Sequence, residues 1–307
     1  EKDLGIKVHV LKKLVHPINP FIDYKGYKEI KRLIKENNYD AVHCHSTKAG
    51  ILGRLAANKL GVKKVIYTVH GYWPILQYEG IKRKIAIFLE RYLANKTTDL
   101  VLISKSDIEL SKRMKIGNEK KYRLIYNKIT VEKDKIGKGV LRKELDVDNN
   151  IKIIGNVSRV DDPKNPFLFI DIANEYLKNN NNVVFVWVGA GNLIQQAKNY
   201  AEKLNLKEKV KFIGFRQNGI EYMKDFDLLL LTSSWEGVPI TILEAIELKI
   251  PILSTDVGGI KEIIGKDSVF ETPKNISELI DKKLNSHEII EYNYDNFVDY
   301  IKLYGID

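Results

Sequence analysis

Apolar and polar positions follow each other along the chain in two alternating patterns. Short apolar runs predict strands, and longer segments with apolar residues three or four positions apart predict helices. The expected strands are 5–11, 41–45, 64–69, 99–104, 152–157, 183–188, 210–213, 227–231 and 251–254. The expected helices are 24–36, 49–60, 81–94, 166–178, 193–204, 219–224 and 239–248. Strands that alternate with helices of this length are typical of parallel βαβ units, so the pattern predicts an α/β fold.

A charged stretch without a steady period separates two sets of these units. It covers residues 127–150. The chain has 307 residues, which fits two domains of ordinary size. We expect an N-terminal domain at 1–130, a linker at 131–150, a C-terminal domain at 151–290 and a helix at 291–307 that could return to the N-terminal domain. Two doubly wound parallel sheets would place a ligand in the cleft between them, at the carboxyl ends of the strands.

Charge is distributed unevenly between the two halves. The chain has a formal net charge of +10, but residues 1–150 carry 32 basic and 17 acidic side chains, and the remainder carries 18 and 23. The basic surplus of the first half predicts an anionic partner such as a membrane surface. There is no recognised nucleic-acid motif, so nucleic acid is not an expected partner.

Composition excludes two further classes. Hydrophobic residues make up 44% of the chain, which is ordinary for a globular protein and argues against disorder. No apolar run approaches the roughly 18 residues that span a bilayer. The single cysteine, Cys44, has no partner for an internal disulfide and fits a reducing compartment.

The stretch 233–245 leaves an expected strand and enters an expected helix. Pro239 is predicted as its first helical residue, with the amides of Ile240 and Thr241 directed out of the helix N-terminus toward a phosphate. Glu236 and Glu244 flank this position, and their carboxylates suit hydrogen bonds to sugar and ribose hydroxyls. The alternative is that they are ordinary loop and surface residues.

A second strand end carries two cations. Arg159 and Lys164 lie between the strand at 152–157 and the following helix. Two cations in this place could hold a diphosphate and stabilise the charge that develops as it leaves. Each residue alone could equally be surface charge, but the two together stand out in the half with an acidic surplus.

These motifs in order resemble a known enzyme family. Arg159 and Lys164, EGVPITILEA at 236–245 and PILSTDVGG at 251–259 are similar to the retaining glycosyltransferases of GT-B family 4, also called glycosyl transferases group 1. YDAVHCHSTKAGILGRLAA at 39–57 and YTVHG at 67–71 most resemble members that assemble bacterial capsule or exopolysaccharide. The resemblance implies the GT-B fold of two Rossmann-like domains facing across a cleft.

The resemblance also implies roles for individual residues. Arg159 and Lys164 would bind the donor diphosphate, Glu244 the ribose, and Glu236 the transferred sugar. His70 would contact that sugar from the N-terminal domain. The turn that would contact the donor consists of Gly237, Val238, Pro239, Ile240 and Thr241. Candidate acceptor contacts, each of which could instead cap a helix or face solvent, are His45, Ser46, Lys48 and Ser104.

The implied activity is transfer of a hexose or N-acetylhexosamine from a nucleotide-diphosphate sugar, with UDP as the expected nucleotide. The acceptor would be a lipid-linked saccharide at the cytoplasmic face of a bacterial membrane. The transfer, which would retain the anomeric configuration, would not require a metal. Family members open with a strand and a glycine-rich loop that we expect to be missing here, and the usual Asn-Gly turn is Asn127-Lys128. A sugar-nucleotide epimerase and a non-catalytic binding or partner subunit are therefore alternatives.

Four other signals have less specific explanations. His43 and His45 share one face of a strand but lack the further ligands of a zinc site. The DxD patterns at 146–148 and 225–227 do not follow strands, and the Gly-Ala-Gly at 189–191 lacks the rest of a dinucleotide fingerprint. The helix at 81–94 is amphipathic with a lysine-rich face, which describes both a core-facing helix and one lying on a membrane.

Overall fold

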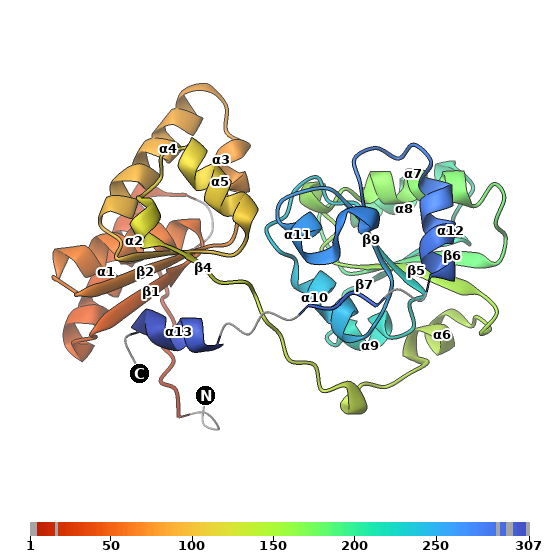
Figure 1. Ribbon diagram of the computed structural model, residues 1–307, viewed down its shortest axis with the longest axis horizontal. Helices are drawn as coiled ribbons and strands as arrows, with labels where there is room; N and C mark the ends of the chain where they lie inside the picture. The colour runs from red at the N-terminus through yellow and green to blue at the C-terminus, as the bar shows by residue number, and fades with distance from the viewer. Residues whose placement is uncertain (1–4, 16–17, 287–288, 293–296, 305–307) are drawn as a thin grey trace. The chain divides into compact units, whose positions relative to one another are not determined.

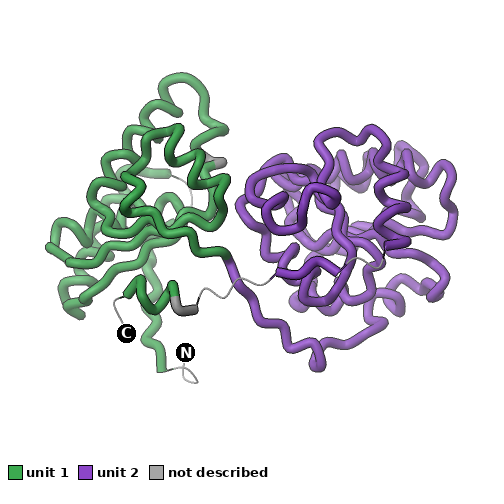
Figure 2. The backbone as a smooth tube through the Cα atoms, in the orientation of Figure 1, with its two compact units in different colours: residues 1–126, 296–307 green, residues 127–295 purple. Residues whose placement is uncertain are grey.

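The computed structural model describes residues 5–15, 18–286, 289–292 and 297–304. The chain divides into two compact units (Figure 2). Unit 1 comprises residues 1–126 and 296–307, and unit 2 comprises residues 127–295. In each unit the described strands form one parallel sheet with helices packed around it (Figure 1).

Unit 1 has a sheet of four described strands in the order β1-β2-β3-β4, so each new strand adds to the same edge. These strands are β1 Ala41–His45, β2 Lys64–Val69, β3 Asp99–Leu102 and β4 Tyr122–Leu124. The helices are α1 Pro20–Asn37, α2 Thr47–Lys59, α3 Trp73–Leu76, α4 Gly80–Asn95, α5 Lys105–Arg113 and α13 Phe297–Tyr304. The Asn19 side chain caps α1 by accepting from the amides of Phe21 and Ile22.

The C-terminal helix α13 belongs to unit 1 although it follows unit 2 in sequence. Leu303 is buried with Ile66 of β2, Val101 of β3 and Ile125, which directly follows β4. The helix is shorter than the expected 291–307, and parts of that range lie outside the described residues.

Unit 2 has a sheet of six described strands in the order β10-β9-β8-β5-β6-β7. They are β5 Lys152–Val157, β6 Val183–Val188, β7 Val210–Gly214, β8 Leu228–Leu231, β9 Ile252–Thr255 and β10 Val269–Phe270. The helices are α6 Val140–Leu145, α7 Pro166–Tyr176, α8 Ile194–Lys203, α9 Gly219–Met223, α10 Ile240–Glu247, α11 Ile260–Ile264 and α12 Ile276–Asn285. Every residue of β6 is buried, which explains its unbroken apolar sequence.

Residues 5–11 do not form the strand that their alternating pattern predicts. Ile6, Val8 and Val10 are 59%, 54% and 81% exposed. The prediction is wrong because the segment pairs with no described strand; of its apolar residues, Leu11 packs against a cluster that includes Val65 of β2. Farther along, the amides of Lys12 and Lys13 donate to the Glu29 carboxylate of α1.

The expected linker at 131–150 is part of unit 2 and contains helix α6. The carboxylate of Asp225 accepts from the amides of Gly139 and Leu141 at 2.7 and 2.8 Å, and Leu141 is completely buried. This stretch is therefore anchored to unit 2 by a residue far away in sequence.

The described residues contain no helix that is both long and apolar enough to span a bilayer.

Candidate active site

The predicted donor residues gather at the carboxyl ends of β5 and β8. β5 pairs with β6 on one side and β8 on the other, so the chain leaves these two central strands in opposite directions. Such a switch point is where open α/β sheets bind ligands. The loop after β5 carries Arg159 and Lys164, and the loop after β8 carries Glu236.

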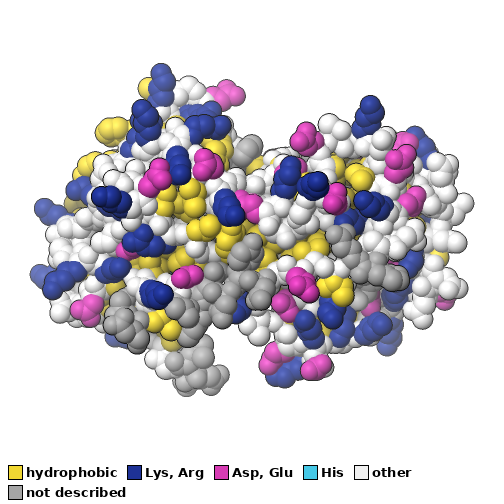
Figure 3. Space-filling view, viewed as in Figure 1, with side chains coloured by type: hydrophobic (Ala, Val, Ile, Leu, Met, Phe, Trp, Pro, Cys, Tyr) yellow, Lys and Arg dark blue, Asp and Glu magenta, His cyan; other side chains and the backbone are white. Residues whose placement is uncertain are grey.

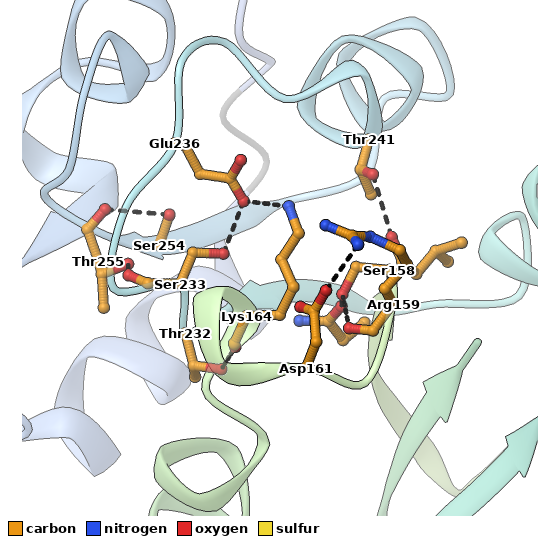
Figure 4. Close-up of polar contacts among 12 residues, drawn as sticks. Ser158, Arg159, Asp161, Lys164, Thr232, Ser233, Glu236, Thr241, Ser254 and Thr255 are labelled. Carbon is orange, nitrogen blue, oxygen red and sulfur yellow. Dashed lines mark hydrogen bonds and ion pairs between the residues drawn. The ribbon is translucent and has the colours of Figure 1, made fainter. Parts of the chain in front are cut away.

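Lys164 and Glu236 form the centre of this arrangement (Figure 4). Lys164 Nζ donates to Glu236 Oε1 at 2.5 Å, and the Ser233 hydroxyl donates to the same oxygen at 2.7 Å. The Lys164 side chain is 18% exposed and that of Glu236 is 9% exposed. A partly buried, doubly hydrogen-bonded carboxylate is held in one orientation, with its second oxygen available to a ligand.

The surrounding backbone fixes both loops. Thr232 Oγ1 donates to the carbonyl oxygen of Lys164 at 3.1 Å, and Thr255 Oγ1 donates to that of Ser233 at 2.6 Å. Gly258 has φ +60, and a Cβ at this position would lie 2.0 Å from the Glu236 carbonyl oxygen. The third loop, after β9, therefore needs a glycine to pack against the Glu236 loop.

Arg159 is more exposed than Lys164. Its side chain is 72% exposed and contacts Asp161 Oδ2 at 2.9 Å. The other Asp161 oxygen, Oδ1, is buried without a hydrogen-bond partner among the described residues. An exposed guanidinium with one carboxylate contact can turn toward an anion without breaking a buried network.

A pocket of about 370 Å³ adjoins these loops. Arg159 and Glu244 line it together with Gly189, Phe215 and Arg216. Burial raises the pKa of Glu244 above its ordinary value. A hollow of this size with a carboxylate and two guanidinium groups on its wall suits a nucleotide.

Phe215 and Arg216 are among the lining residues that were not predicted as site residues. Phe215 is 72% exposed just after β7, and Arg216 follows it. In the sequence, their position directly after a strand is the feature that could have identified them. Gly189 was noted as part of a glycine-rich turn, and a Cβ there would lie 1.8 Å from the Ser158 carbonyl oxygen. Its backbone therefore forms the pocket wall.

The turn into α10 differs from the prediction by one residue. Pro239 is the N-cap with extended backbone angles, and Ile240 is the first helical residue. The amide of Ile242 bonds to the Pro239 carbonyl oxygen, whereas the amides of Ile240 and Thr241 lie in the first turn, where no intrahelical acceptor exists. The Thr241 hydroxyl donates to the Val157 carbonyl oxygen at 3.0 Å and ties the helix to β5.

The remaining residues of this turn contribute mainly through their backbone. Val238 is 5% exposed, so its side chain belongs to the core. Gly237 accepts a hydrogen bond from the Gly259 amide at 3.0 Å, which joins the loops after β8 and β9.

In unit 1, the two predicted histidines come together at the ends of β1 and β2. His45 Nδ1 lies 3.0 Å from His70 Nε2, and His43 Nε2 lies 2.7 Å from the Thr68 hydroxyl. Burial lowers the pKa of His70, and the neighbouring charge of His45 lowers it further. His43 has its pKa lowered to about 4 by burial and by the other two rings. These rings are therefore neutral near pH 7, and the hydrogen bonds that they make are those of uncharged imidazoles.

The other three acceptor-side candidates of unit 1 have different roles. Ser46 is exposed and has φ +63, a backbone conformation that costs energy in a residue other than glycine. Lys48 pairs with Asp23 at 2.6 Å and is 22% exposed. Ser104 is 1% exposed and caps α5 by accepting from the Asp107 amide. Lys48 and Ser104 therefore contribute to the structure of unit 1, and their expected contacts with an acceptor stay a prediction.

The aspartates of the two DxD patterns have structural roles in unit 2. Asp225 caps α6, and Asp227 pairs with Arg142 and Lys152. Asp146 ends α6 in a left-handed conformation. Within the part of the chain that the structure describes, no group of three or more His, Cys, Asp or Glu side chains is arranged to hold a metal ion.

Comparison with known proteins gives matches over both units. The family model described as glycosyl transferases group 1 matches residues 138–297, and that described as Glycosyltransferase Family 4 matches residues 1–133. The chain is 33% identical over 267 residues to the Escherichia coli UDP-Gal:alpha-D-GlcNAc-diphosphoundecaprenol alpha-1,3-galactosyltransferase, covering 84% of this chain and 68% of the relative. It is 28% identical to the Escherichia coli O-antigen biosynthesis glycosyltransferase WbnH, covering 88% and 75%.

Solved structures show the same fold. The structure of Anabaena Alr3699/HepE in complex with UDP and glucose matches with a TM-score of 0.72 at 19% identity, over 88% of this chain and 75% of that one. The two parallel-sheet units are those of the GT-B fold, as the sequence predicts. With the family models that match both units and the 33% identical relative, they show that the chain belongs to the glycosyl transferases group 1 family and is a GT-B glycosyltransferase.

Proposed function

We propose that the chain transfers a hexose or N-acetylhexosamine from a UDP-sugar to a lipid-linked saccharide, with retention of anomeric configuration, in the synthesis of a bacterial surface polysaccharide. The observation that carries this proposal is the Lys164–Glu236 pair at the switch point of unit 2, beside a pocket lined by Arg159 and Glu244. The pair places one cation and one carboxylate where a diphosphate and its sugar would meet.

The comparisons support the choice of donor and acceptor. The 33% identical relative is named for UDP-Gal and for a diphosphoundecaprenol-linked sugar, and HepE has been solved with UDP and glucose. The pocket beside Glu244 could take the uridine, with Phe215 available for stacking against the base and the Glu244 carboxylate for the ribose hydroxyls. Arg159 and the first-turn amides of α10 would then reach the diphosphate.

The chemistry assigned to the protein is positioning and charge stabilisation. The bond between the sugar anomeric carbon and the diphosphate oxygen breaks, and a bond from that carbon to the acceptor oxygen forms on the same face. The acceptor hydroxyl proton passes to the departing diphosphate oxygen. Lys164 and Arg159 would stabilise the negative charge that accumulates on this oxygen, while Glu236 would hold the sugar hydroxyls.

His70 would contact a hydroxyl of the transferred sugar. Its lowered pKa supports a neutral ring that can accept or donate one hydrogen bond, and His45 at 3.0 Å fixes how that ring is oriented. His45 and the exposed Ser46 beside it would lie on the acceptor side. We place the enzyme at the cytoplasmic face of the cell membrane, where a lipid-linked acceptor would be met.

We further propose that transfer proceeds without a metal ion, because Arg159 and Lys164 supply positive charge for the diphosphate. Transfer measured with an excess of EDTA would then equal transfer in added Mg²⁺ or Mn²⁺. A loss of activity in EDTA that Mn²⁺ restores would contradict this part of the proposal.

The whole proposal is tested with a panel of UDP-, GDP- and ADP-sugars, each incubated with and without a polyprenyl diphosphate-linked sugar. We expect consumption of one UDP-sugar that depends on the acceptor, and a product lost in Glu236→Gln. An epimeric sugar nucleotide formed without acceptor would instead identify an epimerase. Binding of UDP without consumption of any sugar nucleotide, in the presence or absence of the acceptor, would identify a non-catalytic subunit.

A further inference from the structure

Helix α4 exposes the apolar residues that a core-facing helix would bury. Ile81, Ile85, Phe88, Leu89 and Tyr92 are 69%, 52%, 67%, 38% and 46% exposed. Their spacing puts them on one stripe of the helix surface, since residues three and four apart lie on the same face. The helix packs onto unit 1 through its opposite face, where Glu90, Leu93 and Ala94 are buried.

Cations border this stripe on both sides. At about 100° per residue, Lys82 lies on one flank of the stripe, and Lys84 and Arg91 lie on the other. All three are exposed. The space-filling view shows apolar and basic side chains side by side over the part of unit 1 where Figure 1 draws α4 (Figure 3).

Acidic charge is absent from the exposed surface of α4. Its sequence contains one acid, Glu90, whose carboxylate oxygens accept from Arg54 at 2.9 and 3.0 Å in the interior. Glu79, just before the helix, is the nearest acid in sequence. The exposed face therefore combines an apolar stripe with a net positive border.

The stripe continues at its C-terminal end into a hollow of about 580 Å³ between α1, α2 and α4. Tyr92 lines this hollow together with Tyr24 and Tyr27, and Lys59 and Lys96 stand at its wall. Lys96 Nζ lies 5.0 Å from the centre of the Tyr92 ring. Tyrosine rings bordered by lysines are the residues that gather at the level of lipid head groups.

We propose that α4 docks unit 1 onto an anionic lipid surface, with the stripe from Ile81 to Tyr92 entering the boundary between head groups and acyl chains. Lys82, Lys84 and Arg91 would contact the anionic head groups at the same depth. An apolar face framed by cations is the arrangement by which a helix lies in the plane of a membrane.

A second copy of the chain fits this face less well. A twofold contact through α4 would place the same face on both sides, so the cations that border the stripe would face each other. Like charges brought together in this way oppose association. A leaflet with anionic lipids supplies both an apolar interior and opposite charge.

This inference deepens the proposed function, because a lipid-linked acceptor is reached at a lipid surface. The test is co-sedimentation of the purified full chain with phosphatidylcholine vesicles that contain or lack phosphatidylglycerol. The assay contains neither donor nor acceptor, so its failure is distinct from a failure of sugar transfer. We expect binding to the anionic vesicles that weakens as salt is raised.

Two variants with matched controls examine the two parts of the surface. Phe88→Ser should weaken vesicle binding about tenfold or more by removing an exposed aromatic ring that would enter the lipid, whereas Val10→Ser, at an exposed valine outside α4, should not. Lys84→Gln should weaken it about fivefold, whereas Lys282→Gln, at an exposed lysine of α12, should leave it unchanged. Unchanged thermal stabilisation by UDP would show that each variant is folded.

Three outcomes would overturn the proposal. Absence of binding to anionic vesicles would do so, as would equal binding by Phe88→Ser and Val10→Ser. The third is a dimer of the wild-type chain in solution that Phe88→Ser dissociates, which would assign the stripe to a second copy.

Discussion

Replacing Lys164 with methionine removes the ammonium group 2.5 Å from Glu236 Oε1 and keeps most of the side-chain length. Breaking a buried ion pair by deleting one partner costs about 3–5 kcal/mol. Lys164 and Glu236 are 18% and 9% exposed, and Ser233 still donates to the remaining carboxylate. We therefore expect a loss of about 2 kcal/mol in the free energy of unfolding, below the fully buried case.

The same change should weaken donor binding. A hydrogen bond to a charged group contributes about 1.5–3 kcal/mol, so loss of the proposed contact between Lys164 and the diphosphate should reduce UDP affinity by about 10- to 150-fold. Glu236→Gln keeps the shape of the side chain and leaves Lys164 without a competing carboxylate. This variant should bind UDP at least as tightly as the wild type, yet transfer sugar about 10- to 150-fold more slowly.

Isothermal titration with UDP, urea denaturation and a transfer assay measure these three quantities on the same preparations. The double variant should recover part of the stability lost in Lys164→Met, because no unpaired carboxylate remains. The reasoning is refuted if Lys164→Met binds UDP normally. It is also refuted if folded Glu236→Gln loses UDP affinity to the same extent as Lys164→Met, because the pair would then serve only the architecture of the loops.

Three further predictions follow from local features. Burial raises the pKa of Glu244 above the ordinary 4.5. If the ionised carboxylate binds the ribose, affinity for a UDP-sugar should therefore fall as the pH decreases through this raised pKa. Binding titrations at several pH values should show this fall in the wild type and a flat profile in Glu244→Gln. Gly258→Ala should lower the free energy of unfolding by about 1–3 kcal/mol and slow transfer, because its Cβ would lie 2.0 Å from a backbone carbonyl oxygen. The control Gly139→Ala, at φ +81 with nothing within 4 Å, should cost less in urea melts and leave turnover intact. Arg54→Met should destabilise the chain by about 3–5 kcal/mol in the same melts, because it leaves Glu90, 4% exposed, without its partner; a loss below about 1 kcal/mol would show that the pair is dispensable.

Most strands of the two sheets were predictable because parallel strands are buried on both faces, whereas the short strands β4 and β10, of 3 and 2 residues, were not predicted. Val183–Val188 is apolar throughout and every residue is buried, so hydrophobicity alone identifies it. Residues 5–11 have an equally clear alternating pattern but no described neighbour to pair with. A strand depends on a partner that its own sequence does not specify.

The expected linker illustrates a second limit. Its polar sequence hides a helix because the residue that caps α6, Asp225, is 84 positions away from Leu141. Lys48 shows the same effect in unit 1, since its partner Asp23 is 25 positions away. Local composition cannot reveal a contact whose two members lie on different elements.

The sequence predicts that the proposed donor-side residues lie at one edge of the sheet, but it does not predict their contacts. Arg159, Lys164 and Glu236 all follow strands, which places them at the same sheet edge. The direct contact between Lys164 and Glu236 joins loops 72 positions apart and needed the structure. Phe215 was missed because a single exposed aromatic residue after a strand has no distinctive spacing.

Helix α4 illustrates a limit of periodicity. The pattern places Ile81, Ile85 and Phe88 on one face, but it does not say whether that face meets the core. In the structure the helix packs through its other side, around Glu90 and Leu93. The alternative of a membrane-facing helix therefore gains support from exposure, a quantity that the sequence does not contain.

The central claim is that this chain moves a sugar from a UDP-sugar to a lipid-linked saccharide. Mass spectrometry of a polyprenyl diphosphate-linked sugar, incubated with the protein and a mixture of UDP-sugars in detergent, tests it most directly. The account predicts an acceptor heavier by one hexose or N-acetylhexosamine, formed together with UDP, and no such product with Glu236→Gln. An acceptor of unchanged mass alongside consumption of the UDP-sugar would contradict the account.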